Sequence, residues 1–267
     1  MEKVRYEEML PHETVARRQK FAAAFLGLGG LEWHGEHLAI GNDALKAEKL
    51  CELAAVQSGG FVFPTLWYGE PRITGIMESD HDGEDMIRSK MEFTESKFSE
   101  FHFGSSAEEQ IKFYQQLLNH LLLEMNQLEM KAICLLSGHY PIYDWALPVV
   151  EQFNARFNDS RAFVGTEFHY ALALSNMQLG DNFRDQVNEG IQIGVGGDHA
   201  AKWETSYLWY LRPDCVDMSI YLGREEEPLI GVWGTDPRKE ASIEIGRNAC
   251  NIIVQGMVHM AKTLLGM

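Results

Sequence analysis

The sequence predicts an α/β fold in which a mostly parallel sheet is covered by helices on both faces. Short apolar runs alternate along the 267 residues with longer segments that have the periodicity of amphipathic helices. The apolar runs are hydrophobic at consecutive positions, as in strands that are buried on both faces. With 45% hydrophobic residues and no Pro/Ser-rich linker, the chain is expected to form a single domain over residues 1–267.

The expected elements follow from these runs in chain order. Strands are expected at the apolar runs, which are residues 21–31, 60–68, 132–136 and 162–165. Helices are expected where apolar side chains recur at helical spacing, which are residues 43–58, 142–157, 199–212 and 241–265. Another helix begins at a capping box formed by Ser105 and Glu108, and its apolar face carries Ile111, Tyr114, Leu118, Leu121 and Met125.

Charge and cysteine content exclude several classes of function. The 39 acidic and 23 basic residues give a net charge of −16, which opposes binding to nucleic acid or to anionic membranes. The start of the chain is charged and no run of about 18 apolar residues occurs, so neither export nor membrane insertion is expected. The cysteines lack CxxC spacing and predict reduced core thiols in a cytoplasmic protein: Cys51, Cys134, Cys215 and Cys250.

The segment from Gly29 to Asp43 carries the first candidate metal ligands. Glu32 and His34 follow the first expected strand, and residues two apart at a strand end point the same way. Asp43 lies in the first turn of the next helix, where its oxygens can meet either free backbone N–H groups or a cation. Taken singly, the aspartate is more simply a helix cap and the histidine a solvated loop residue. Together, these residue types predict a metal site.

Other strand ends carry the same kinds of residue. His139 follows the strand at 132–136 on a glycine-supported turn, and a glycine-rich stretch leads into His199 and Glu204. Because the carboxyl ends of parallel strands meet at one edge of a sheet, we expect these side chains to lie near Glu32 and His34. The alternative places His199 in a helix cap and leaves Glu204 solvated or paired in the core.

Some further features have weaker interpretations. The loop at residues 67–85 is expected to line the pocket, to cover it, or to form a subunit contact, and His81, His37 and His169 are weaker ligand candidates. Glu36 and His37 are interpreted as loop structure. The chain has no GxSxG serine elbow, and residues 194–197 lack the lysine and serine or threonine of a phosphate-binding loop.

These motifs resemble those of the creatininase (creatinine amidohydrolase) family. The family pattern GxxEQHGxHLPxGxD corresponds to residues 29–43, its GH pair to Gly138 and His139, and its HAxxxETS segment to residues 199–206. Residues 231–237 resemble the closing GxxGDP pattern. The resemblance implies a three-layer α/β/α fold, a hydrolytic site with two divalent metal ions per subunit, and a homo-oligomer that is often a hexamer.

The resemblance also implies roles for individual residues. Glu32, His34, Asp43 and His139 match metal ligands, with Asp43 bridging, while Glu204 matches a metal ligand or base and His199 matches the active-site histidine. Two departures bear on the substrate. Pro141 stands where creatinine-hydrolysing members have a metal-binding glutamate, and residues 195–198 lack their substrate-holding tryptophan.

The sequence therefore predicts a metal-dependent amidohydrolase. The expected reaction is hydrolysis of a C–N amide bond in a small molecule, a cyclic amide (lactam) or a formamide, by metal-activated water with His199 as the proton donor. Carboxylate and imidazole ligands suit zinc, manganese or iron. The alternative is a noncatalytic small-molecule-binding or assembly protein on the same scaffold, which Pro141 favours and the otherwise intact set of candidate ligands opposes.

Overall fold

The core of the molecule is a parallel sheet of four strands. The computed structural model describes residues 3–69, 84–93, 102, 104–175 and 183–267. Within these residues the sheet has the order β2-β1-β3-β4, and β1 pairs with both β2 and β3. The strands are β1 (Ala23–Leu28), β2 (Phe61–Leu66), β3 (Ala132–Ser137) and β4 (Arg161–Gly165).

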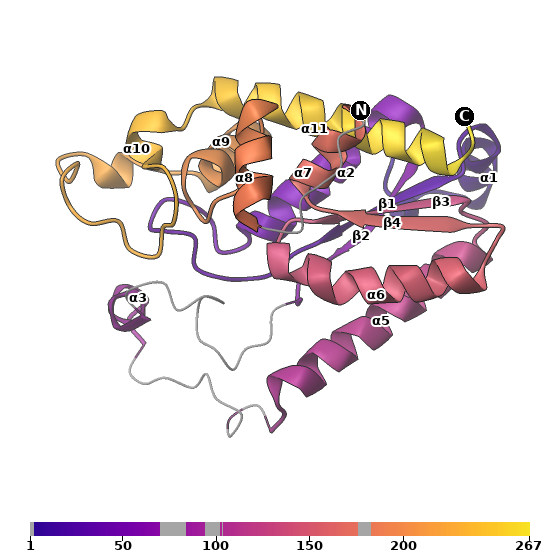
Figure 1. The fold of residues 1–267 in the computed structure, drawn as a ribbon, viewed down its shortest axis with the longest axis horizontal. Coiled ribbons are helices and arrows are strands. Elements are labelled where there is room, and N and C mark those ends of the chain that lie inside the picture. The colour runs from indigo at the N-terminus through magenta and orange to yellow at the C-terminus, as the bar shows by residue number, and fades with distance from the viewer. Residues whose placement is uncertain (1–2, 70–83, 94–101, 103, 176–182) are drawn as a thin grey trace.

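Helices cover both faces of this sheet (Figure 1). Ala23 and Phe25 of β1 pack in one core with α2 (Asn42–Ser58) and α11 (Ile243–Leu264). The alternate residues of β1 pack in the second core with α5 (Ala107–Gln127) and α6 (Tyr140–Arg156). The predicted α/β fold with a parallel sheet between two helical layers is thus confirmed.

Further helices complete the described structure. α7 (Glu167–Ala173) and α9 (Lys202–Leu211) pack against α11. The remaining helical segments are η1 (Tyr6–Glu8), α1 (Pro11–Lys20), α3 (Glu84–Lys90), α8 (Phe183–Gln192), η2 (Pro213–Cys215), η3 (Met218–Tyr221) and α10 (Pro237–Glu240). None of the described helices is both long and apolar enough to cross a membrane.

The expected helix at residues 199–212 is wrong at its start. The carboxylate of Asp198 accepts the backbone N–H groups of Trp203 and Glu204 at 2.7 and 3.1 Å, which satisfies the donors at the start of α9. The intervening backbone is not helical, since Ala200 has a φ of 53°. His199 instead exchanges two backbone hydrogen bonds of 2.8 Å with Trp233. The imidazole therefore enters the site from an extended segment and not from a helix.

Two other expectations need correction. The cap of α5 is Ser106 and not Ser105, because the Ser106 hydroxyl accepts the N–H of Glu109, whose carboxylate accepts the N–H of Ser106. Cys215 is only half-buried, at the end of η2, whereas the other three cysteines lie in the core as predicted. In that core, burial raises the pKa of the Cys134 thiol to about 12.

Residues 70–83 of the expected pocket loop, His81 among them, lie outside the described part of the chain.

The capping arrangement predicts a stability difference between two neighbouring serines. Replacing Ser106 by alanine removes the acceptor for an N–H group of α5, so the free energy of unfolding should fall by about 1 kcal/mol. Ser105→Ala is the matched control, because Ser105 does not cap the helix. Urea denaturation of both variants measures the effect, and equal stabilities would contradict the assignment.

Candidate metal centre

The site forms where the first turn of α2 meets the ends of β1 and β3. Gly29 follows β1 and Gly138 follows β3, and each lies directly against this turn. A Cβ atom on Gly29 would overlap the backbone of Ala44, and one on Gly138 would overlap the carbonyl oxygen of Asp43. Glycine at these two positions therefore lets the turn lie between the strand ends. As a result, Asp43 is placed beside residues from both strands.

A first group of ligand-type side chains consists of Glu32, Asp43 and His139. The Nδ1 atom of His139 lies 3.1 Å from Oε1 of Glu32 and 3.0 Å from Oδ2 of Asp43. All three residues are buried. A hydrogen bond of 3.0 Å from the N–H of Glu32 to the carbonyl of Ile40 closes the loop that joins Glu32 to α2. We call this group triad 1.

A second group consists of His34, Asp43 and Glu204, and we call it triad 2. The Nε2 atom of His34 lies 3.1 Å from Oδ1 of Asp43 and 3.4 Å from Oε2 of Glu204. The backbone N–H of Ala200 donates to that same Oε2 atom at 2.8 Å, which orients the carboxylate. Asp43 thus belongs to both triads, and it faces each of the two imidazoles with a different oxygen.

His199 lies beside both triads. Its ring stacks on that of His34 with a centroid separation of 4.5 Å, and its Nδ1 atom is 3.7 Å from Oε1 of Glu32. Its other nitrogen, Nε2, lies 2.8 Å from the carbonyl oxygen of Trp33. Since a carbonyl only accepts hydrogen bonds, Nε2 carries the hydrogen and Nδ1 presents its lone pair toward the carboxylates. The structure therefore brings all six predicted site residues together.

The charges in the site suit a divalent cation. Burial disfavours a charge on His34, but the carboxylates of Asp43, Glu204 and Glu32 outweigh burial and raise its pKa to about 9. Burial opposes ionisation of Asp43 as well, yet the neighbouring histidines hold its pKa well below the usual value. The Nε2 atom of His34 makes no hydrogen bond to the described residues, although three carboxylate oxygens lie within 3.6 Å. Nitrogen and oxygen donors that converge in this way fit zinc, manganese or iron.

Two buried charged residues next to the site were not predicted. The ammonium group of Lys46 hydrogen-bonds to Oε1 of Glu204 and lies 3.4 Å from Oε1 of Glu167. The carboxylates of Glu167, Glu204 and Asp43 outweigh the effect of burial and raise the pKa of Lys46. The rule that ligand-type residues follow strand ends could have identified Glu167, which comes two residues after β4. The sequence offered one indication that Lys46 lies near the site. It follows Asp43 by three residues, so the two side chains share a face of the helix.

The other polar residues of the opening segment have structural roles. Nε2 of His37 lies 2.8 Å from the Thr205 hydroxyl, and Nδ1 lies 3.0 Å from that of Tyr221. Burial and the nearby charge on His34 lower the pKa of His37 to about 4. Glu36 forms ion pairs with Arg224 and Lys90. These contacts agree with the interpretation of Glu36 and His37 as loop structure.

His169, the other weak ligand candidate, is a buried helix-cap residue. Its Nδ1 atom accepts the backbone N–H of Thr166 at 3.2 Å, and its ring stacks on Tyr143 at 4.3 Å. Burial lowers the pKa of His169 to about 4. The residue is therefore neutral in the folded chain at physiological pH, and it belongs to neither triad.

This environment predicts a pH-dependent stability. An unfolded histidine titrates near pH 6.5, so between about pH 6.5 and 4 the unfolded chain binds a proton that folded His169 does not. The contribution of neutral His169 to the free energy of unfolding is complete above pH 6.5. It falls by roughly 3 kcal/mol as the pH drops to 4. In His169→Gln, which keeps an acceptor but does not titrate, urea denaturation of the metal-free protein should show a weaker pH dependence. The exposed His259→Gln is the control, and equal slopes in the wild type and His169→Gln would contradict the prediction.

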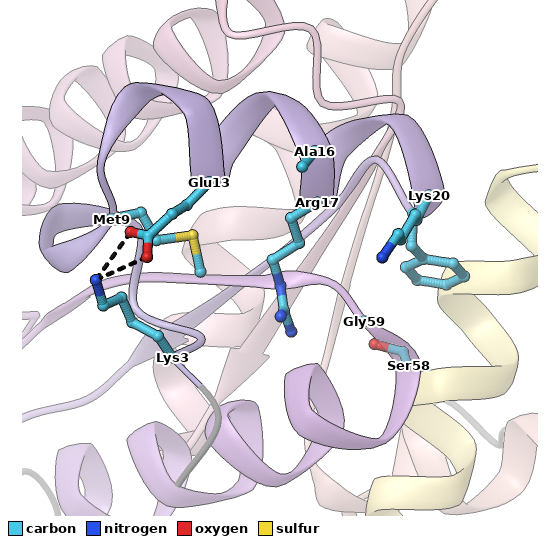
Figure 2. Close-up of a pocket in the computed structure, with 9 residues that line it drawn as sticks. Lys3, Met9, Glu13, Ala16, Arg17, Lys20, Ser58 and Gly59 are labelled. Atoms are coloured by element: carbon cyan, nitrogen blue, oxygen red, sulfur yellow. Dashed lines mark hydrogen bonds and ion pairs between the residues drawn. The ribbon is translucent and has the colours of Figure 1, made fainter.

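A separate cavity lies at the opposite end of α2. Its volume is about 420 Å³, and Figure 2 shows Lys3, Glu13, Arg17 and Lys20 among its lining residues. The Lys3 ammonium pairs with Glu13, and the Arg17 guanidinium donates to the carbonyl oxygens of Gly60 and Ala55. A helix of 17 residues is roughly 25 Å long. This cavity is therefore distinct from the candidate metal centre.

Comparisons with known proteins confirm the resemblance to creatininases. Residues 7–77 match the family model Creatininase, described as creatinine amidohydrolase. Three solved structures are similar over 98% of this chain and of their own: creatinine amidohydrolase (creatininase), with 17% identity and a TM-score of 0.65; a structure named creatininase Mn, with 20% and 0.64; and a mutant creatininase of Zn-Zn type, with 18% and 0.63. No curated protein sequence matches the chain. At these identities the structures show a shared fold.

Proposed function

We propose that this chain, which has the creatininase fold and matches the creatinine amidohydrolase model at its N-terminal end, is a metal-dependent amidohydrolase that acts on a small molecule. The reaction is the hydrolysis of a C–N amide bond in a lactam or a formamide. The observation that carries the proposal is the position of Asp43, which turns one carboxylate oxygen toward His139 and the other toward His34. A carboxylate shared in this way suits a bridge between two cations.

The two triads divide the cation-binding residues between them. Glu32, Asp43 and His139 would hold one divalent ion, and His34, Asp43 and Glu204 the second. A bound divalent ion lowers the pKa of water to about 7 and polarises the substrate carbonyl. The Ala200 N–H keeps one oxygen of Glu204 directed at His34, so Glu204 is oriented before any ligand binds.

His199 is the residue proposed to move the proton. Its Nε2–H donates a hydrogen bond to the Trp33 carbonyl, which leaves Nδ1 to accept a proton from the attacking water. Both ring nitrogens carry hydrogen in the resulting imidazolium. The Trp33 carbonyl stabilises this cation because it still accepts the hydrogen bond from Nε2–H. Nδ1 subsequently donates that proton to the nitrogen that leaves as the C–N bond breaks. His199 thus acts as a base first and as the expected proton donor afterwards.

The substrate class is tested by activity screening of metal-reconstituted protein. Protein purified without chelator is analysed for transition metals, then reconstituted with Mn²⁺ or Zn²⁺ and assayed on small amides, lactams and formamides. Metal retained by the wild type together with release of an amine or carboxylate product would support the proposal. Full metal retention without hydrolysis of any of these substrates would favour the noncatalytic binding protein, and failure to retain metal would contradict both triads.

A further inference from the structure

We propose that His37 is a positioning residue of the candidate metal centre. It acts through Thr205 and Ala200, which hold the carboxylate of Glu204 in triad 2. This inference rests on the proposed function, since it assumes that Glu204 binds a divalent ion. It gives His37 a role in the metal centre beyond the contacts that fix its loop.

The imidazole of His37 lies between two hydroxyl groups in the interior of the protein. The residue is 2% exposed. Its Nε2 atom lies 2.8 Å from Oγ1 of Thr205, and its Nδ1 atom lies 3.0 Å from the hydroxyl oxygen of Tyr221. Thr205 is itself fully buried and follows Glu204 on α9. Because both ring nitrogens have partners, a rotation of the ring would leave buried polar groups unpaired, which is costly.

The directions of these hydrogen bonds follow from the contacts of Thr205. Its hydroxyl group lies 3.2 Å from the carbonyl oxygen of Ala200, and its single hydrogen is donated there because a carbonyl only accepts. The Thr205 oxygen therefore accepts from His37, so Nε2 carries the hydrogen. Since burial lowers the pKa of His37 to about 4, the ring is neutral and Nδ1 accepts from Tyr221. The hydrogen bonds thus run in one direction, from the Tyr221 hydroxyl to the Ala200 carbonyl.

The backbone of Ala200 has a conformation that depends on such support. Its φ of 53° lies in the left-handed region, which residues other than glycine rarely adopt. Such conformations persist where the surrounding contacts hold them. The carbonyl of Ala200 accepts the Thr205 hydroxyl, and its side chain packs in a small core with Leu38, the neighbour of His37. The loop that carries His37 therefore supports Ala200 from two sides.

The N–H group of Ala200 determines the direction of one Glu204 oxygen. It donates to Oε2 at 2.8 Å, and Oε2 is the oxygen that lies 3.4 Å from Nε2 of His34. The other oxygen, Oε1, hydrogen-bonds to Lys46. Without support at its carbonyl, Ala200 could leave the left-handed conformation and carry this N–H group away from Oε2. Groups behind the ligands of a metal contribute about 10- to 100-fold to metal affinity or activity.

The test is a calorimetric titration of the metal-free protein with Mn²⁺. Thr205→Val removes the hydroxyl group with little change in volume, so the apparent affinity for Mn²⁺ should fall by about 10- to 100-fold. Thr205→Ser restores a hydroxyl group at the same position and should recover most of the affinity. A role of Thr205 in packing alone would not distinguish valine from serine in this way.

A second pair of variants examines His37 itself. His37→Gln can still place an N–H donor near the position of Nε2, and it should keep most of the Mn²⁺ affinity. The shorter side chain of His37→Asn reaches only the position of Nδ1, so it loses the donor to Thr205. Its Mn²⁺ affinity should fall as in Thr205→Val. The double variant of Thr205→Val and His37→Asn should bind Mn²⁺ no more weakly than either single variant, because both break the same series of hydrogen bonds.

Thr166→Val is the matched control for a general loss of stability. Thr166 is also buried, and its hydroxyl oxygen lies 2.9 Å from Nδ1 of His169. The variant loses a buried threonine–histidine hydrogen bond that belongs to neither triad. It should melt at a lower temperature than the wild type but bind Mn²⁺ with the same affinity.

The outcomes separate the role of His37 from the proposed function. Wild-type affinity in Thr205→Val and His37→Asn would overturn the role of His37 alone, as would an equal loss in Thr205→Ser or Thr166→Val. If neither Thr205→Val nor His37→Asn folds, hydrogen exchange of the wild type decides, because rapid exchange of the Ala200 amide contradicts a held backbone. A wild type that binds no Mn²⁺ contradicts the proposed function as well.

Discussion

Replacing Asp43 by asparagine is expected to abolish hydrolysis and to remove metal from both sites. Asp43 is the residue shared by triads 1 and 2, and its neighbours would face an amide that carries no charge. A divalent ion contributes several kcal/mol to stabilising the transition state. Activity should therefore fall by roughly a thousandfold or more. Metal analysis of the purified variant, together with an amide hydrolysis assay, measures both effects.

The matched control for this variant is Glu48→Gln. Glu48 lies on the same helix, but its carboxylate pairs with Arg5 outside the site. This variant should retain the metal content and activity of the wild type. If Asp43→Asn kept two equivalents of metal, the bridging assignment would be wrong. Loss of activity in Asp43→Asn with full metal content would assign the residue a role in catalysis and not in metal binding.

Replacing His199 by glutamine is expected to lower the catalytic rate by about 10²- to 10⁴-fold while the metal remains bound. The side-chain amide of glutamine can still donate a hydrogen bond to the Trp33 carbonyl, but it cannot carry a proton from water to the leaving nitrogen. The loss should appear in kcat and not in the metal content. The pH dependence that His199 imposes on kcat should disappear in the variant. The exposed His259→Gln on α11 should behave as the wild type.

Metal analysis of His199→Gln separates two roles for this histidine. Glu32, His34 and His199 also lie close enough to form a group that could hold an ion. A variant that loses one equivalent of metal would identify His199 as a ligand, against the proposed role. A variant that keeps its metal and its activity would remove His199 from the mechanism altogether.

Much of the fold could be predicted from local sequence patterns. The consecutive apolar residues of β1 and β3 are typical of strands buried on both faces, and the structure places them at the centre of the sheet. The position of the site followed from the same logic, because parallel strands bring their carboxyl ends to one edge. Glu32 and His139 follow adjacent strands for this reason. Periodicity is a local property, so the sequence alone is sufficient to detect it.

Element boundaries depended on contacts that the local pattern does not specify. Residues 199–201 have a helix-compatible composition, yet Asp198 caps α9 and holds them outside the helix. The strand predicted at 21–31 ends at Leu28, and the next residue, Gly29, lies directly against the backbone of Ala44 in the first turn of α2. In both cases the helix begins or the strand ends where a side chain or a backbone group makes a contact that the local sequence pattern does not specify. Such contacts override intrinsic propensity.

The sequence by itself determined the fold class and the residue types that converge at one edge of the sheet, because both depend on short-range periodicity and on strand direction. Only the tertiary structure decided how the charges are arranged there. Lys46 and Glu204 are 158 residues apart, and their contact arises from the packing of α2 against α9. The packing of α2 against the ends of β1 and β3 turns the two oxygens of Asp43 toward different partners, His34 and His139. Electrostatic interactions depend on distances of a few ångströms, and those distances are set by packing between elements that are remote in the sequence.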